Sequence, residues 1–199
     1  MAINNVIIEG VDRLGKNLLI DGIQHSLGFF QVIHYQKPKL LDFFIENARS
    51  GLMSDRTESE VKAEALKLYQ YNSFITMFKL LRDNTRLICN RAHLGETVYA
   101  KRYRNYNGNY VFDIERRFHE SENSLNKTLL VLLYTSDFSF ITDDGLSLDV
   151  TKREEEQNDF IEAYSKSIIP NKIMIDVNNG SSGFISKDLV LGAVLNRMK

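Results

Sequence analysis

Glycine and lysine residues near the N-terminus have the spacing of an anion-binding loop. The run Val6-Ile7-Ile8-Glu9 leads into Gly10-Val11-Asp12-Arg13-Leu14-Gly15-Lys16-Asn17, and the apolar residues Leu18-Leu19-Ile20 follow. A strand, a glycine-bearing loop and a helix in this order form the context in which such a loop binds phosphate. Glycines let the backbone turn successive N–H groups inward, the helix N-terminus adds a positive dipole end, and the Lys16 ammonium reaches terminal phosphate oxygens. The pattern predicts a nucleoside triphosphate site; the alternative, a plain glycine turn, gives Lys16 no role.

The residue after this lysine bears on metal binding. The position usually holds serine or threonine, whose hydroxyl binds the magnesium ion that accompanies the triphosphate, but here it is Asn17. An amide oxygen can also coordinate a hard cation, although it is neutral and sits on a longer side chain. We therefore expect Mg²⁺ as the cofactor, with altered affinity or geometry. The residues expected to bind the ATP phosphates are Gly10, Gly15, Lys16, Asn17 and Leu18.

The run from Glu9 to Lys16 resembles the phosphate loop of thymidylate kinases, in the branch that carries arginine inside the loop. The resemblance implies that Asp12 contacts the sugar and acceptor side of a nucleoside monophosphate, and that Arg13 bridges the donor and acceptor phosphates. A guanidinium is well shaped to stabilise the charge of a phosphoryl group in transfer. The alternative is that Arg13 is a solvated loop residue paired with Asp12.

A second element of the resemblance is the run Leu87-Ile88-Cys89-Asn90-Arg91, which ends the third predicted strand. The resemblance implies that Arg91 clamps the acceptor phosphate, whereas Asn90 stands where the family has an aspartate that helps to organise magnesium. An arginine at the end of an apolar strand beside Lys16 is repelled unless an anion lies between them. The alternative is a salt bridge from Arg91 to a nearby carboxylate.

Asparagine at both metal positions, Asn17 and Asn90, weakens the expected metal site. The resemblance implies that both positions help to bind the metal, but neither asparagine carries the group that the family uses there. The acidic residues that remain near the site are Glu9 and Asp12, and Glu9 is alternatively a plain strand end. The sequence therefore leaves two readings open, an active kinase and a retained fold with weak or altered chemistry.

The acceptor side of the site is predicted from the resemblance at several positions. Lys37 stands where the family has an arginine that grips the acceptor phosphate, unless it is a surface lysine. The long predicted helix Glu58–Arg82 leans over the acceptor nucleoside, where Tyr69 or Phe74 stacks on a pyrimidine unless these aromatic residues belong to the core. Ser73 falls where a base-reading arginine is expected, so a modified pyrimidine or a broader set of deoxynucleotides fits as well as thymine.

Two further groups are assigned to the donor side. Residues 137–153 are polar and are expected to form a lid, and Lys152 and Arg153 would close over the donor phosphates and exclude water. The alternative is that these two cations pair with Glu154–Glu156 on the surface. Asn178 lies in the connection where this fold places the adenine, and it could read the base edge unless the stretch is a flexible turn.

The elements that must position these residues follow from hydrophobic periodicity. The five predicted strands are Asn5–Glu9, Phe29–His34, Thr85–Cys89, Lys127–Tyr134 and Lys172–Val177. The predicted helices are Lys16–Leu27, Glu58–Arg82, Leu94–Arg104, Lys152–Ser167 and Ser186–Met198. This alternation predicts an α/β fold, a doubly wound five-stranded parallel sheet flanked by helices, and the resemblance makes it a P-loop kinase fold with a lid. Ligands in such folds bind beyond the carboxyl ends of the strands.

Composition excludes several other classes of protein. Lysine plus arginine number 25 and aspartate plus glutamate 26, for a net charge of -1, so no overall cationic field attracts duplex DNA or acidic lipid. The only cysteine, Cys89, lies in an apolar run, which excludes disulfides within the chain and fits a reducing compartment. No run approaches the roughly 20 apolar residues of a membrane span. We expect one cytoplasmic domain over residues 1–199 that binds no membrane and no nucleic acid.

These patterns together predict an enzyme, a deoxynucleoside monophosphate kinase that transfers the γ-phosphoryl group of ATP to dTMP or to a related, possibly modified deoxypyrimidine monophosphate. The expected catalytic residues are Arg13, Lys16 and Arg91, which position and neutralise the reacting phosphates. The resemblance also implies a homodimer that packs helices such as Glu58–Arg82 across a two-fold axis.

Two alternatives stay open. The first is a kinase whose acceptor is a hydroxyl, on a deoxynucleoside or on a modified base within DNA. Its only dense basic candidates are Arg102, Arg104, Arg116 and Arg117. The second is a nucleotide-binding protein with little catalysis, which the two asparagines suggest.

Overall fold

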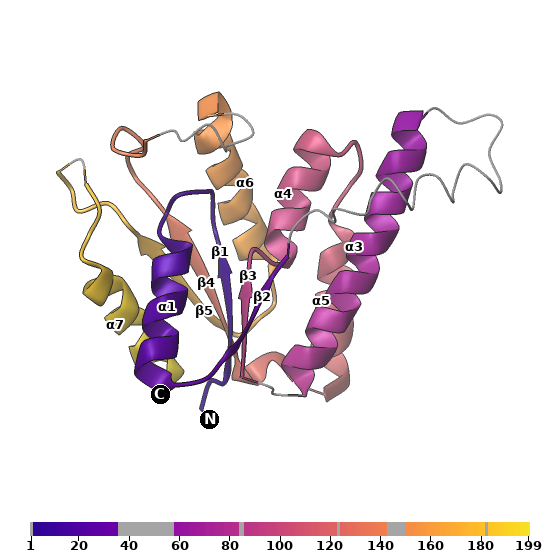
Figure 1. Ribbon diagram of the computed structural model, residues 1–199. Helices are drawn as coiled ribbons and strands as arrows, with labels where there is room; N and C mark the ends of the chain where they lie inside the picture. Colours follow the sequence, from indigo (N-terminus) through magenta and orange to yellow (C-terminus); the bar gives the residue numbers. More distant parts are fainter. Residues whose placement is uncertain (1, 36–57, 84–85, 123, 143–149, 182) are drawn as a thin grey trace.

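The computed structural model describes residues 2–35, 58–83, 86–122, 124–142, 150–181 and 183–199. Within these ranges a five-stranded, all-parallel sheet has the order β2-β3-β1-β4-β5 (Figure 1). The strands are β1 (Asn5–Glu9), β2 (Gln31–His34), β3 (Leu87–Asn90), β4 (Thr128–Tyr134) and β5 (Asn171–Asp176). All five predicted strands are therefore confirmed, with ends that differ by at most two residues.

The central strands are continuous apolar runs because both of their faces are covered. Every residue of β1 is buried, and so are the first six residues of β4. Alternation of polar and apolar residues is expected only where one face of a strand meets water. Burial on both faces explains why these strands are recognisable in the sequence as short, uninterrupted hydrophobic segments.

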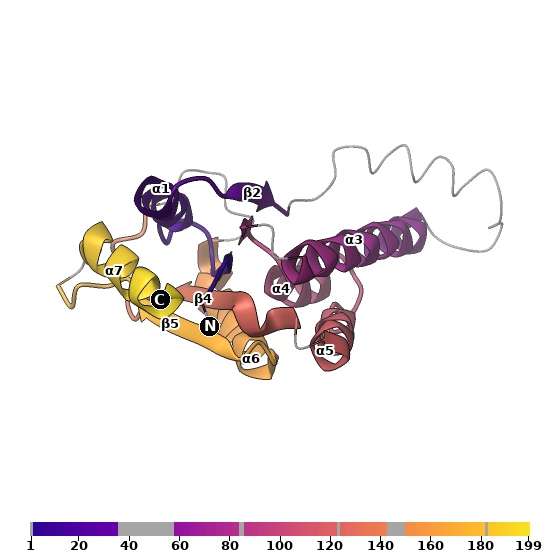
Figure 2. The same ribbon diagram turned by 90° about the horizontal axis from the view of Figure 1, so that it is seen from below.

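Helices cover both faces of the sheet, as predicted. Figure 2 shows α1 and α7 on one face and α3, α4, α5 and α6 on the other. The described α-helices are α1 (Lys16–Leu27), α3 (Glu58–Arg82), α4 (His93–Tyr103), α5 (Tyr110–Glu122), α6 (Arg153–Lys166) and α7 (Lys187–Met198). In the described part of the chain, no helix is both long and apolar enough to cross a membrane.

Helix α5 has no counterpart in the sequence analysis. Its apolar face is narrow: Val111 and Ile114 are buried, and Phe118 stacks on Phe78 of α3 with ring centroids 5.8 Å apart. The rest of the helix is polar, so the segment is hydrophilic as a whole although its apolar residues recur with clear helical periodicity. That periodicity was the signal available in the sequence. Helix α5 packs against α3 on the same face of the sheet (Figure 2).

Strand register brings the loops that carry chemistry to one edge of the sheet. Ile8 of β1 pairs with Asn90 of β3, and Glu9 pairs with Leu132 of β4. The loop after β1, the end of β3 and the end of β4 therefore meet at the carboxyl edge, which is the upper edge in Figure 1. This is the edge where the sequence analysis expects the ligand.

Candidate phosphate-binding site

The loop between β1 and α1 has the backbone that its glycines were expected to permit. Gly10 has φ = +129°, and a Cβ there would lie 2.2 Å from the carbonyl oxygen of Leu133 on β4, so no side chain fits. Gly15, the N-cap of α1, has φ = +82°, and Arg13 adopts φ = +71° although it carries a side chain. A non-glycine residue in the left-handed region costs about 1–3 kcal/mol and occurs mostly at functional sites.

Lys16 points back into this loop. Its Nζ donates hydrogen bonds to the carbonyl oxygens of Gly10 at 2.8 Å and Val11 at 2.6 Å, and the residue is only 6% exposed. Burial lowers the pKa of Lys16 to about 8; Asp12 and Glu9 oppose this shift, and the nearby Arg91 adds to it. A buried ammonium group beside a second cation is stabilised when an anion binds between them. This agrees with the predicted role of Lys16, which is to bind phosphate.

Arg91 lies beside the loop, at the place that the sequence analysis gives it. Its Nη2 is 2.7 Å from Oδ1 of Asp12, and the same oxygen is 3.8 Å from Nζ of Lys16. The Arg91–Asp12 contact is an ion pair without hydrogen-bond geometry, and Arg91 has φ = +57°. One carboxylate oxygen thus lies between the two cations. The predicted alternative, a salt bridge from Arg91 to a carboxylate, is present, and that carboxylate belongs to the phosphate loop.

Glu9 organises the neighbouring helix. Its Oε1 accepts hydrogen bonds from the backbone N–H groups of Ala92 at 3.0 Å, Leu94 at 2.9 Å and Gly95 at 3.4 Å, at the start of α4. Burial raises the pKa of Glu9, while His93, these N–H donors and Lys16 act in the opposite direction. Glu9 is therefore a cap that ties β1 to α4.

Asn17 and Asn90 are hydrogen-bond partners of each other. Nδ2 of Asn90 donates to Oδ1 of Asn17 at 2.9 Å and lies 3.0 Å from Nδ1 of His34, while Oδ1 of Asn90 is buried without a partner. Across the described ranges no group of three or more His, Cys, Asp or Glu residues could hold a metal ion. Oε1 of Glu9 caps α4 and Asp12 pairs with Arg91, but Oε2 of Glu9, like Oδ1 of Asn90, is buried without a hydrogen-bond partner. Oxygen atoms of this kind suit a hard cation such as Mg²⁺.

The two aromatic residues predicted to stack on a base differ in their exposure in the structure. Tyr69 lines a cleft of about 720 Å³ between β2 and α3, together with Ile33, Tyr35 and Ser73. Phe74 is 2% exposed and packs on Tyr35 with ring centroids 5.7 Å apart. Phe74 is therefore a core residue and has no free face for a base, which corrects its assignment to the acceptor site. Tyr69 keeps an exposed ring.

The predicted cations around the site are only partly described. Lys37 lies outside the described residues. Lys152 ends the 3-10 turn Val150–Lys152, and Arg153 begins α6, where its Nη1 donates to the carbonyl oxygen of Ile141 at 3.3 Å. Arg13 makes a similar contact, from its Nη1 to the carbonyl oxygen of Thr142 at 3.3 Å. Both arginines thus contact the segment that follows β4.

Asn178 is committed to its own loop. Its Oδ1 accepts from the N–H of Gly180 at 2.8 Å, and its Nδ2 donates to Oγ of Ser136 at 3.2 Å. The side chain closes a turn and bridges to the loop after β4, so both halves of the amide are already engaged. The structure therefore gives Asn178 a turn-forming role, and its reading of an adenine edge stays a prediction.

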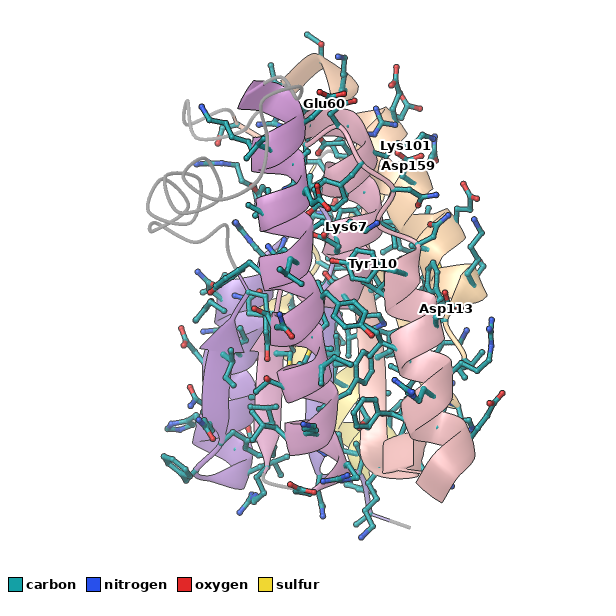
Figure 3. All side chains as sticks on the ribbon, turned by 90° about the vertical axis from the view of Figure 1, so that its right-hand side faces the viewer. Glu60, Lys67, Lys101, Tyr110, Asp113 and Asp159 are labelled. Atoms are coloured by element: carbon teal, nitrogen blue, oxygen red, sulfur yellow. The ribbon has the colours of Figure 1, made fainter. Side chains whose placement is uncertain are left out.

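A buried carboxylate that the sequence analysis missed ties α4 to the turn that follows it and to α5. Glu96 on α4 accepts hydrogen bonds from Arg104 at 2.5 Å, Tyr106 at 2.5 Å and Tyr110 at 2.8 Å. Figure 3 shows Tyr110 in the layer formed by α3 and α5. Burial raises the pKa of Glu96, and its hydrogen-bond donors counteract the shift. A glutamate inside the apolar stretch that opens α4, followed by two tyrosines, was the available signal.

Three of the four arginines considered for an oligonucleotide groove, Arg102, Arg104 and Arg116, pair with carboxylates. Arg102 contacts Asp159 at 2.6 Å and Glu155 at 2.9 Å, and Arg116 contacts Asp113 at 3.2 Å. Figure 3 shows Asp113 and Asp159 on the same side of the molecule as Lys101. Carboxylates are thus interspersed with the cations over this part of the described surface.

Comparisons with known proteins agree with this architecture. No protein-family model and no curated protein matches the sequence. Among solved structures, the YorR protein of Bacillus subtilis in complex with phosphorylated GDP is 20% identical, with 98% of each chain covered and a TM-score of 0.57. Thymidylate kinase from Candida albicans is 14% identical over 98% of this chain and 90% of its own, with a TM-score of 0.53. Thymidylate kinase from Ehrlichia chaffeensis is 14% identical over 98% of both chains, with a TM-score of 0.52.

At these identities the comparisons establish a fold. The chain has the α/β fold of P-loop kinases, with the five-stranded parallel sheet and its flanking helices. Within that class, its likeness extends over nearly the whole chain to thymidylate kinases. The resemblance first noted in the phosphate loop is thus matched by the fold, whereas the roles of individual residues rest on the site itself.

Proposed function

We propose that the chain is a nucleoside monophosphate kinase that transfers the γ-phosphoryl group of ATP to dTMP or a related deoxypyrimidine monophosphate. The observation that carries the proposal is the meeting of Lys16 and Arg91 at one anionic oxygen, Oδ1 of Asp12. These cations come from different elements, the β1–α1 loop and the end of β3. A donor phosphate held by the loop and an acceptor phosphate held by Arg91 would therefore be neighbours.

The proposed reaction needs no side-chain base. An oxygen of the acceptor phosphate attacks the γ-phosphorus of ATP, the bond from that phosphorus to the β–γ bridging oxygen breaks, and ADP leaves with that oxygen. Lys16 neutralises the donor phosphates, Arg91 holds the acceptor phosphate, and Arg13 lies in the loop where charge develops. We propose that magnesium enters with the substrate, as Mg·ATP, and that Oε2 of Glu9 and Oδ1 of Asn90 would help to hold it.

The acceptor is the least constrained part of the proposal. Tyr69 offers a ring to a base in the cleft between β2 and α3, and Ser73 lines the same cleft without the charge of an arginine. Stacking is tolerant of base identity because every base presents a π-face. We therefore expect modified bases to be accepted, and the preference for a deoxypyrimidine acceptor rests on the resemblance to thymidylate kinases.

A coupled assay of ADP release tests the proposed function. Purified protein would receive Mg·ATP with each deoxynucleoside monophosphate, a free deoxynucleoside or single-stranded DNA, in parallel. We expect turnover with a monophosphate, at least about 100-fold less in Lys16→Ala and Arg91→Ala because transition-state charge is left unpaired, and unchanged rates in Lys79→Ala. Lys79 is exposed near the far end of α3. No turnover on any monophosphate would end the proposal, and turnover confined to the nucleoside or DNA would transfer it to a hydroxyl acceptor.

One observation favours a second candidate, a nucleotide-binding protein with little catalysis. The hydrogen bond between Asn17 and Asn90 joins the two positions that organise magnesium in active relatives of the fold. The double variant Asn17→Ser, Asn90→Asp restores a hydroxyl and a carboxylate there. ATP binding without turnover in the natural chain, with turnover gained in the double variant, would favour this candidate over the kinase.

The same proposal extends to the assembly. We propose a homodimer that packs α3 across a two-fold axis, in line with the family resemblance. Sedimentation equilibrium would then give twice the chain mass of 23.0 kDa. A single species at the chain mass across micromolar concentrations would contradict the dimer without touching the proposed chemistry.

A further inference from the structure

Ionisable side chains from three elements are buried behind the phosphate-binding site. Glu9 at the end of β1, His93 at the start of α4 and Glu115 on α5 are each at most 1% exposed. Helices α4 and α5 lie in the same layer over one face of the sheet (Figure 2). Burial of ionisable groups costs free energy, and it is concentrated at functional sites. Glu9 is explained as the cap of α4, which leaves His93 and Glu115 to be explained.

Glu115 is held by the connection between α6 and β5. Its Oε1 accepts hydrogen bonds from the hydroxyl of Ser167 and from the N–H of Ile169 at 3.3 Å, while its Oε2 is buried without a hydrogen-bond partner. Burial acts to raise the pKa of Glu115, but His93 and the Ser167 hydroxyl outweigh burial, so the pKa is lowered. The group is therefore an ionised carboxylate at neutral pH.

His93 lies against this carboxylate. Its Nε2 is 3.7 Å from Oε1 of Glu115, and both ring nitrogens are buried without a hydrogen-bond partner. Because an ionised carboxylate only accepts, the ring nitrogen that faces it carries the proton. From the sheet side, burial raises the pKa of Glu9 and the charge of His93 opposes that rise. Phe78 of α3 meets the imidazole edge to face, with centroids 5.2 Å apart.

Two residues before His93, the backbone of Arg91 is in an unfavourable conformation. Its φ of +57° lies in the left-handed region, where a residue with a side chain stays only if the structure on both sides holds it there. On one side, β3 ends at Asn90, and the N–H of Arg91 donates to the carbonyl oxygen of Ile8 at 3.1 Å. On the other side, α4 begins at His93. The placement of the first turn of α4 therefore decides whether Arg91 keeps this conformation.

That first turn is attached at two points. Oε1 of Glu9 holds its backbone N–H groups, and the imidazole of His93 attaches it to Glu115 on α5. A helix end held at one point can pivot, whereas a second attachment fixes its direction. Packing alone does not require an imidazole, since a phenylalanine would fill the same space beside Phe78. A buried ion pair is weak evidence for stability, so we look for its value in the geometry that it enforces.

We infer that His93, held by Glu115, is a positioning residue that fixes the first turn of α4 and thereby keeps the guanidinium of Arg91 at the acceptor phosphate. The inference rests on the role of Arg91 in the proposed function. It separates the acceptor side from the donor side, because Lys16 is held by the loop carbonyls of Gly10 and Val11 and not by α4.

A double-mutant cycle tests whether the effect of His93 passes through Arg91. The pair variant, His93→Phe with Glu115→Gln, leaves no lone buried charge, and the glutamine oxygen still accepts from Ser167. Inorganic pyrophosphate would be titrated calorimetrically into the natural chain, the pair variant, Arg91→Ala and their combination. We expect the pair variant to weaken pyrophosphate about tenfold in the natural chain and less than about twofold when Arg91 is absent. Equal losses in the two backgrounds would overturn the inference.

Two further variants separate positioning from a general loss of structure. His93→Gln keeps an N–H that reaches Glu115, so it should bind pyrophosphate within about threefold of the natural chain. His25→Phe, at an exposed position on α1, is the matched control and should change nothing. Failure of His93→Gln to exceed the pair variant would overturn the inference. A pair variant that is unfolded without urea would do so too, because the pair would then be needed for the fold itself.

Kinetics give the corresponding split between donor and acceptor. In the pair variant we expect the KM for dTMP to rise about tenfold while ATP binds as it does in the natural chain; an equal loss of both affinities would contradict the inference and leave the kinase proposal intact. Conversely, absence of monophosphate turnover in the natural chain would end the kinase proposal, and the pyrophosphate cycle would still decide whether His93 positions Arg91.

Discussion

At the scale of residues, the site is a set of cations held by the loop's own oxygen atoms. Lys16 is bound by two backbone carbonyls, and Arg91 is paired with Asp12. Each of these oxygens is an acceptor that a phosphate could replace. Phosphate oxygens carry more charge than a carbonyl, and they approach from outside the loop. Ligand binding at this site is therefore an exchange of internal acceptors for external ones.

The lowered pKa of Lys16 gives binding a pH dependence. The pKa is about 8 in the folded chain and 10.5 in an unfolded one, so the unfolded chain binds more protons between these values and stability rises with pH across that window. Anion binding has the opposite sign, because it favours the protonated ammonium. We expect ATP affinity to fall by up to about tenfold per pH unit above pH 8. Titrations from pH 7.5 to 9.5 would show this, and a flat profile would exclude Lys16 as a contact.

Asp12 should compete with weakly bound anions. Its Oδ1 occupies the space between Arg91 and Lys16, in an ion pair without hydrogen-bond geometry. Removing the charge in Asp12→Asn should raise the affinity for inorganic pyrophosphate about threefold, a modest gain because the pair is partly exposed. The titration belongs at pH 6.5, since the loss of Asp12 lowers the pKa of Lys16 further.

The matched control for that variant is Asp21→Asn on α1, which makes the same change in net charge at an exposed position. An equal gain in pyrophosphate affinity in the two variants would show that the effect of Asp12→Asn comes from the change in net charge and not from its position. Weaker pyrophosphate binding in Asp12→Asn would show that Asp12 supports anions at this position instead of competing with them.

At the scale of elements, the turn after α4 packs closely against that helix. The turn, residues 104–109, is held by the Glu96 hydrogen bonds, and a Cβ at Gly108 would lie 2.4 Å from the backbone oxygen of Glu96. Backbone atoms within a helix cannot yield as a flexible side chain does. The position therefore requires glycine because of space, although its φ is ordinary.

Gly108→Ala should destabilise the chain by about 1–3 kcal/mol because the added methyl group overpacks the contact with α4. Gly192→Ala on α7 is the matched control: nothing lies within 4 Å of its built Cβ, and alanine is the better helix former by up to about 1 kcal/mol. Urea unfolding of both variants would measure this. Equal stability of the two variants would contradict the packing described for the turn.

The elements also show what sequence patterns can and cannot predict. The phosphate loop was predictable because its glycine positions and lysine act through local backbone geometry. Strands β1 and β4 were predictable because burial on both faces leaves a continuous apolar run. The Glu96 cluster was not, since its donors lie 8 to 14 residues away and meet only after α4 and α5 pack.

The direction in which each side chain points was the second feature that the sequence could not predict. Tyr69 and Phe74 both suited base stacking in sequence, and only the packing of α3 on β2 shows that Phe74 faces Tyr35 in the core. Asn178 likewise suited base reading, and only the structure shows its amide in the turn at Gly180. Chemistry-bearing residue types are visible in a sequence, but their partners depend on contacts between distant segments.

At the scale of the whole molecule, the residues proposed to bind phosphate lie together at one edge of the sheet. The phosphate loop and Arg91 lie where β1 and β3 end, while the opposite edge holds the connections between helices and strand starts (Figure 1). The central claim is that this edge binds polyphosphate through Lys16. Calorimetry of ATP binding at pH 7 to the natural chain, Lys16→Ala and Lys79→Ala tests it most directly. We predict saturable binding in the natural chain and Lys79→Ala and none in Lys16→Ala; binding unaffected by Lys16→Ala, or absent from the natural chain, would contradict the account.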